Sequence, residues 1–136
     1  MDAALSPKEL IEESTLENGL TLRLYDRSRR VAGDRWFVSL LAEIEVPIDR
    51  DQLLGCHHGP EQVIDDFIKE ARGKVVFRME KERNFLDERE REEVLDGLLH
   101  TLKENCLDYF GHDSFGPGFI RRRFKDWLEK RNWWKE

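Results

Sequence analysis

The chain has 136 residues with a hydrophobic content of 39%, which is enough for one domain with its own core. Charged side chains make up 38% of the residues and the formal net charge is −6, which argues against a dedicated nucleic-acid-binding protein. An aromatic content of 10% argues against a disordered chain. No apolar run approaches the roughly 18 residues of a membrane span, so we expect no membrane partner.

The first residues predict a helix and a cytoplasmic location. Ser6, Pro7 and Glu9 match a capping box with proline at the first helical position, so we expect a short helix over 7–13. The same stretch lacks the basic and apolar regions of a secretory signal. Cys56 and Cys106 have no paired spacing, which is typical of free thiols in a reducing compartment.

A hairpin turn is predicted at Asn18-Gly19, because both residues tolerate the positive φ of a tight turn. Leucines at 20, 22 and 24 then alternate with polar residues, which predicts a strand over 20–25. The stretch before the turn, 14–17, is short for a strand, so the first arm of the hairpin stays open. Residues 26–35 form a polar, arginine-rich connection with a turn at Gly33-Asp34.

The clearest strand pattern covers 36–46. One side carries only apolar residues, namely Trp36, Val38, Leu40, Ala42, Ile44 and Val46. The other side carries Phe37, Ser39, Leu41, Glu43 and Glu45. Because strand side chains alternate between the two faces of a sheet, the apolar set must cover a core. Pro47 ends the strand, since proline cannot donate to a ladder.

The rest of the chain alternates between helical and extended patterns. Residues 49–60 read as irregular, 60–71 as an amphipathic helix, and 74–81 as a strand. Asp87 and Glu90 predict the start of the longest helix, which Gly111 can stop. A last helix is expected over 117–131, with its buried face at Ile120, Phe124, Trp127 and Leu128.

These elements predict a single α+β domain over 1–136. We expect a small antiparallel sheet of three to four strands, packed by three main helices. A loose tail that contains Trp133 and Trp134 would follow the last helical turn.

Two basic segments are candidate binding sites. Residues 117–136 hold seven basic and three acidic side chains, and the cations near the start of the helix are Arg121, Arg122, Arg123 and Lys125. Cations there oppose the positive end of a helix, a conflict that is sometimes functional. Such cations can bind either the phosphates of a nucleic acid or the carboxylates of an acidic peptide. Pairing with the acidic middle of the chain is the structural alternative.

The second basic segment is the connection 26–35, with Arg27, Arg29 and Arg30. Binding loops are often of this kind, although solvated turns are polar as well. The sequence does not say whether this segment and the last helix share one face.

Metal binding and catalysis have less support in the sequence. Cys56-His57-His58 offers zinc-type ligands, but no ligand pair has the spacing of a metal site. Ser114 or Cys56 could be combined with His58, His100 or His112, yet no nucleophile motif or nucleotide loop is present. We therefore predict no catalytic residues, metal or cofactor.

The leading hypothesis is a cytoplasmic, non-enzymatic protein-interaction or self-association module, for example a homodimer. Its expected contacts are Phe37, Leu41, Trp133 and Trp134, because clustered exposed apolar residues mark interfaces. A nucleic-acid-binding accessory protein that uses the arginine-rich last helix is the alternative. A thiol or metal site at Cys56-His57-His58 is the third hypothesis.

Overall fold

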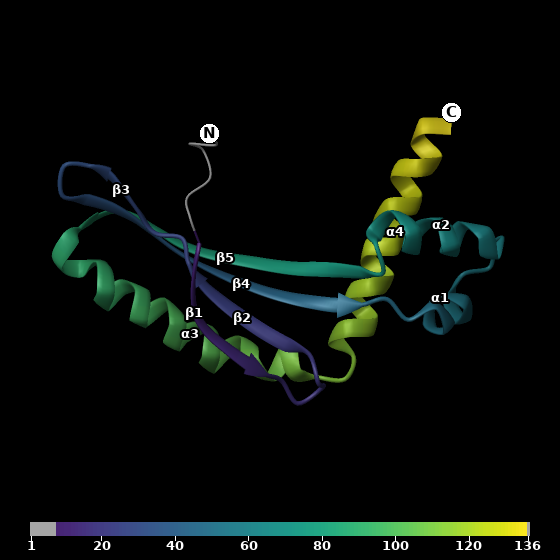
Figure 1. The fold of residues 1–136 in the computed structure, drawn as a ribbon, viewed down its shortest axis with the longest axis horizontal. Helices are drawn as coiled ribbons and strands as arrows, with labels where there is room; N and C mark the ends of the chain where they lie inside the picture. Colours follow the sequence, from purple (N-terminus) through teal and green to yellow (C-terminus); the bar gives the residue numbers. More distant parts are fainter. Residues whose placement is uncertain (1–7, 136) are drawn as a thin grey trace.

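The fold has two layers, a five-stranded antiparallel sheet and four α-helices (Figure 1). The structure, a computed structural model, describes residues 8–135, with side chains except at 85, 86 and 132–135. The strands are β1 (Glu9–Thr15), β2 (Thr21–Asp26), β3 (Arg29–Ala32), β4 (Arg35–Pro47) and β5 (Lys74–Asp87). The helices are α1 (Arg50–Cys56), α2 (Glu61–Ala71), α3 (Arg91–Gly111) and α4 (Phe115–Lys135), with the short 3₁₀ helix η1 (Glu88–Glu90) before α3. The predicted α+β class is confirmed.

β4 is the central strand of the sheet. β2 and then β3 pair with successive parts of one of its sides, and β1 extends the sheet beyond β2. β5 pairs with the other side of β4 from Pro47↔Lys74 to Arg35↔Asp87. β4 and β5 therefore form a long ribbon on which the shorter strands are built.

The alternation predicted for 36–46 is confirmed. Val38, Leu40, Ala42, Ile44 and Val46 are all buried, on the face of the sheet that meets the helices. All four helices contribute to the same core cluster, through residues such as Leu53, Ile64, Leu102 and Phe124. One face of the sheet is thus covered by the helical layer.

The opposite face of the sheet is covered by charged side chains instead. Glu13, Arg23, Glu43 and Arg78 lie in register on β1, β2, β4 and β5, so that negative and positive charges alternate across the four strands. Arg23 Nε lies 2.8 Å from Glu13 Oε2, and Arg78 Nε lies 2.7 Å from Glu43 Oε2. Opposite charges directly across a pair of strands stabilise a sheet.

The predicted helices are confirmed in α2, α3 and α4, and their apolar residues join the core or pack against it. The start predicted at Asp87 is wrong, because Asp87 ends β5 and α3 begins at Arg91 after η1. α4 begins two residues earlier than expected and continues to Lys135. The backbone that carries Trp133 and Trp134 is therefore helical rather than a loose tail. No helix within residues 8–135 combines the length and apolar content needed to cross a bilayer.

The helix expected over 7–13 is wrong. Pro7 lies outside the described residues, and Glu9–Thr15 forms β1, which pairs with β2 across the Asn18-Gly19 turn. The capping signal is local, whereas the strand gains a ladder and two ion pairs, Glu13 with Arg23 and Glu12 with Lys103 at 2.7 Å. Tertiary contacts here outweigh helix propensity.

Two stretches expected to be irregular contain regular structure. Residues 50–56 form α1, whose N-cap Asp49 accepts a hydrogen bond from the Asp51 N–H at 3.1 Å. The connection 26–35 contains β3, which turns at Gly33, where φ is +57°, and returns along β4. β5 also extends six residues beyond the predicted strand end at Lys81.

The β1–β2 turn is tied to the helical layer by Asn18. Its Nδ2 donates to the carbonyl oxygens of Phe110 at 2.8 Å and His112 at 3.1 Å, at the C-terminal end of α3. Its Oδ1 accepts from the Leu20 N–H at 3.1 Å. One side chain thus stabilises the turn and satisfies carbonyl groups that the end of α3 leaves free.

Candidate functional site

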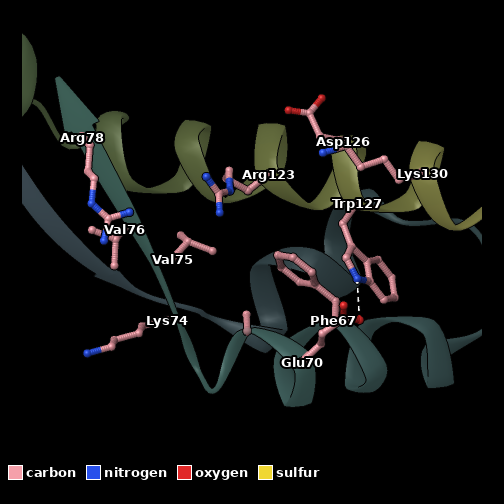
Figure 2. A pocket seen from close by; sticks show the side chains of 11 residues that line it. Phe67, Glu70, Lys74, Val75, Val76, Arg78, Arg123, Asp126, Trp127 and Lys130 are labelled. Carbon is pink, nitrogen blue, oxygen red and sulfur yellow. Dashed lines mark hydrogen bonds between the residues drawn. The ribbon is translucent and has the colours of Figure 1, made fainter. Parts of the chain in front are cut away.

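A cleft of about 470 Å³ lies between α2, the first residues of β5, and α4 (Figure 2). This volume is within the range typical of ligand-binding pockets. α2 contributes Phe67, Glu70 and Ala71. β5 contributes Lys74, Val75, Val76 and Arg78, and α4 contributes Arg123, Asp126, Trp127 and Lys130.

Helical spacing places the cations of α4 on different flanks. Arg123, Asp126 and Lys130 are separated by three and four residues, so they share the flank that borders the cleft. Arg121 and Lys125, also four residues apart, are exposed and do not line it. Arg122 is exposed as well. Of the four cations predicted on this helix, the structure therefore brings only Arg123 into the cleft.

The aromatic end of the cleft is held in place by polar contacts. The Trp127 Nε1–H donates to Glu70 Oε2 at 2.8 Å, as the dashed line in Figure 2 shows. The Trp127 ring packs against Phe67, with centroids 5.4 Å apart, and Arg131 lies over it at 5.1 Å. Arg131 is in turn fixed to Asp66 at 3.0 Å. The wall formed by α2 and α4 is therefore preorganised.

Asp66 supports this wall electrostatically. Hydrogen bonds from Gln62 and then from Arg131 hold the pKa of the Asp66 carboxyl below its usual range. The carboxylate is therefore fully charged near neutral pH and keeps Arg131 over the indole.

The cleft gathers more positive than negative charge. Lys74 and Arg78 each have an acidic partner on β4, Glu45 at 3.0 Å and Glu43 at 2.7 Å. Arg123 and Lys130 have no ion pair with any residue in the described part of the chain. Figure 2 shows Arg123 projecting from α4 into the space between the helix and β5. The arrangement suits an anionic group.

Among the described residues, the acidic middle of the chain neutralises Arg131 of α4, through Asp66, but not the three predicted cations of α4 that lie outside the cleft. Within residues 8–135, Arg121, Arg122 and Lys125 form no salt bridge. The structural alternative considered for these residues, pairing with acidic neighbours, is therefore not found in the described chain.

The second basic segment lies at the other end of the molecule (Figure 1). Arg27 is paired with Glu80 at 2.8 Å, and the Arg29 guanidinium lies 5.1 Å from the Phe37 ring centroid. Arg30 is exposed on β3. The two basic segments thus do not form one surface.

The four residues predicted as apolar interface contacts differ in their exposure to solvent and in whether the structure describes their side chains. Leu41 is only 2% exposed, so its expected exposure is wrong. Its register partners are Tyr25 and Glu80, and the aliphatic stems of neighbouring paired side chains can cover it. Phe37 is half-buried. The side chains of Trp133 and Trp134 lie outside the described residues.

The cysteine and histidine candidates are dispersed. Cys56 is exposed, and the neighbouring His57 ring packs edge-on against Phe124 with centroids 5.3 Å apart. Cys106 packs against the core from α3. In the described part of the chain, no three His, Cys, Asp or Glu side chains are placed to share a metal ion.

Ser114 and His112 form the closest pair of catalytic residue types, with Ser114 Oγ 2.8 Å from His112 Nδ1. The same nitrogen accepts the Ser114 backbone N–H at 3.1 Å. The pair lies in the exposed turn between α3 and α4, and Ser114 O accepts from the Gly118 N–H at 3.0 Å. These bonds are those of a turn that starts a helix.

Lys74, Arg78 and Glu70 were not predicted as site residues, whereas Lys130 lies within the basic segment 117–136. No local pattern marks the first three residues, because the cleft exists only where β5 and α2 meet α4. No protein-family model, curated protein or solved structure gives a significant match to this chain.

Proposed function

We propose that this protein is a non-enzymatic interaction module that binds an acidic segment of a partner protein in the cleft. The observation that carries the proposal is that Arg123 and Lys130, both without ion pairs in the described chain, line the same cleft as Lys74 and Arg78 of the facing strand. The chain as a whole carries a net charge of −6. A concentrated positive site on an acidic protein steers and selects an anionic partner.

A protein segment fits the cleft better than a nucleic acid does. Single-stranded nucleic acids need open aromatic faces for their bases. The Trp127 ring is instead flanked by Phe124, with centroids 6.2 Å apart, and by Arg131. A nucleic acid would bring a charge at every nucleotide toward Glu70 and Asp126, whereas a peptide can direct its uncharged side chains and its N–H groups toward these two acids.

The proposal keeps the interaction hypothesis but moves the contact surface. Because Leu41 is buried, we propose the partner surface at α4 and β5 instead. Trp133 and Trp134, at the end of α4, remain candidates for further partner contacts. Cys56 and Cys106 are free thiols, which supports the cytoplasmic location that we propose.

The test compares two double variants of the same helix. R123Q/K130Q removes the cleft charges, and R121Q/K125Q removes two charges from the other flank. With a labelled peptide of alternating glutamate and valine, we expect the first variant to weaken binding roughly tenfold, because it deletes two charge contacts. We expect the second to weaken it less than about threefold, because solvent and salt screen distant charges. Fluorescence anisotropy measures both affinities.

Two results would contradict the proposal. Equal losses in the two variants would mean diffuse attraction to α4 rather than binding in the cleft. Tighter binding of a single-stranded oligonucleotide than of a peptide of equal charge, with a steep loss at higher salt, would favour the nucleic-acid alternative.

A further inference from the structure

One edge of β5 has no strand partner in the described chain. β5 pairs with β4 along its length, and no other strand of residues 8–135 pairs with it. Among these residues, no backbone group outside the β4–β5 ladder bonds to the backbone of Lys74–Arg78. Open strand edges present free N–H and C=O groups in a row, which is a template for another extended chain.

The first part of this strand forms a wall of the cleft. Lys74, Val75, Val76 and Arg78 all line it, and α4 lies across from them in Figure 2. The stretch from Lys74 to Arg78 spans about 13 Å at roughly 3.3 Å per residue in a strand. The wall is thus long enough for four or five residues of an extended segment, at the same spacing.

We propose that the acidic partner segment pairs with the open edge of β5 and adds a strand to the sheet beside α4. This inference rests on the proposed function and specifies its binding mode. Backbone hydrogen bonds to β5 supply affinity, as in other cases of strand addition, and alternate side chains supply specificity. Because side chains of a strand alternate between faces, every second side chain of the segment would point toward Arg123 and Lys130 on α4, and in an alternating glutamate–valine segment these are the carboxylates.

Charge complementarity selects this occupant over a second copy of the chain. Residues 74–78 contain two cations, Lys74 and Arg78, and no acidic residue. A second β5 paired at this point would bring the same two cations into a cleft that already holds Arg123 and Lys130. Like charges on neighbouring strands are destabilising. An acidic segment brings the opposite charge to the same positions.

Hydrogen exchange of the full chain, with and without the glutamate–valine peptide, tests this mode. At a peptide concentration of ten times Kd, outward-facing amides of 74–78 should exchange roughly tenfold more slowly, because exchange then needs the free state. Amides of 81–83, on the same strand beyond the cleft residues, should be unchanged and serve as the internal control.

Two N-methylated peptides, one modified at every glutamate and one at every valine, provide a second readout. The N–H groups that face one edge of a strand come from alternate residues. One of these peptides should therefore bind at least about tenfold more weakly, since several hydrogen bonds are lost, while the other keeps its affinity. Charge is the same in both.

The outcomes separate the two levels of the proposal. Peptide binding that requires Arg123 and Lys130, but protects no amide of 74–78 and tolerates both N-methylation patterns, overturns strand addition and leaves the proposed function in place. Absence of peptide binding overturns both. Protection of the same amides by increasing concentrations of the protein alone would identify a second copy as the occupant and overturn the acidic partner.

Discussion

At the scale of single residues, Glu43 is a largely buried carboxylate on the charged face of the sheet. Its side chain is 12% exposed and accepts from Lys8 Nζ at 3.0 Å and Arg78 Nε at 2.7 Å. Burial acts to raise the pKa of this carboxyl, but hydrogen bonds from Lys8 and Arg78 outweigh it and hold the pKa below its usual range. Glu43 on β4 therefore links β5 to the residue that precedes β1 electrostatically.

We expect E43Q to lower the free energy of unfolding by roughly 1–2 kcal/mol at pH 7, because it removes a charged acceptor shared by two donors. A carboxyl group whose pKa is lowered by folding stabilises the fold at pH values above its pKa in the unfolded chain, about 4.3. This contribution is lost as the pH falls through the pKa of the folded state. The difference between E43Q and the unsubstituted chain should thus narrow below about pH 4. Urea unfolding at several pH values measures it.

Glu45 provides the matched control. It also pairs with a lysine on β5, Lys74, but both side chains are about half exposed. E45Q should change stability by less than about 0.5 kcal/mol at any pH, as is usual for a surface pair. A loss in E45Q as large as in E43Q would mean that net charge, rather than the buried position of Glu43, sets the effect.

At the scale of elements, the junction between α2 and β5 sets the shape of the cleft. Arg72 and Gly73 both adopt left-handed backbone conformations, with φ of +60° and +83°. Their N–H groups donate to carbonyl oxygens of the last turn of α2, including Lys69 at 3.2 Å and Ile68 at 3.0 Å. These two residues reverse the chain and start β5 beside the helix that it leaves.

Substitutions at the two residues of this junction should change the stability of the fold in opposite directions. G73A should lower stability by about 1 kcal/mol or more, because alanine is strained at positive φ. The added Cβ would meet no atom within 4 Å, so the cost is that of the backbone alone. R72G should raise stability by roughly 0.5–1 kcal/mol, since glycine relieves the same strain. Thermal unfolding of both variants measures these changes, and a stabilised G73A would refute the left-handed junction.

Periodicity predicted the elements that pack against one large core. The alternation in 36–46 and the stripes of α2, α3 and α4 were read correctly, because burial on one face leaves a regular spacing in the sequence. β1 and β3 could not be read in this way. Both are edge elements with mostly exposed side chains, so their sequences carry little apolar alternation and their pairing depends on distant strands.

The candidate site was predictable only in part. The cations of the last helix stand out in the sequence, but spacing alone does not say which flank of that helix meets β5. Lys74 and Arg78 carry no local signal, since their position opposite Arg123 depends on how the ribbon of β4 and β5 lies against α4. Contacts between elements distant in the chain decide the site.

At the scale of the whole molecule, charge is distributed unevenly. α4 carries seven basic and two acidic side chains over 115–135. The arginine-rich turn at the other end adjoins acidic residues at the end of β5 and in η1, since the Glu88 N–H donates to Asp34 O at 3.0 Å and Asp87 lies in register with Arg35. Acidic side chains near this turn, including Glu80 paired with Arg27, offset its positive charge, so we expect α4 to be the dominant positive surface.

Replacement of the distant arginines should therefore leave peptide binding unchanged. We expect R29Q/R30Q to bind the glutamate–valine peptide within about twofold of the unsubstituted chain. The β4 partners of Arg29 and Lys74 are Phe37 and Pro47, so roughly 33 Å of strand separates them, several times the Debye length of roughly 8 Å. Anisotropy at low and moderate salt measures this. A tenfold loss would show that both basic segments contact the partner.

The amide of Asn18 links the beginning of the chain to its end, with consequences for synthesis. Its carbonyl partners, Phe110 and His112, follow it by 92 and 94 residues. During translation the β1–β2 hairpin emerges long before α3 is complete, so its turn cannot dock and its first strand has only its neighbour to hold it. Two-stranded hairpins alone are marginal in water. The leucines of the nascent N-terminal half therefore stay exposed until the C-terminal helices have left the ribosome. We expect a chaperone to bind the chain during this interval.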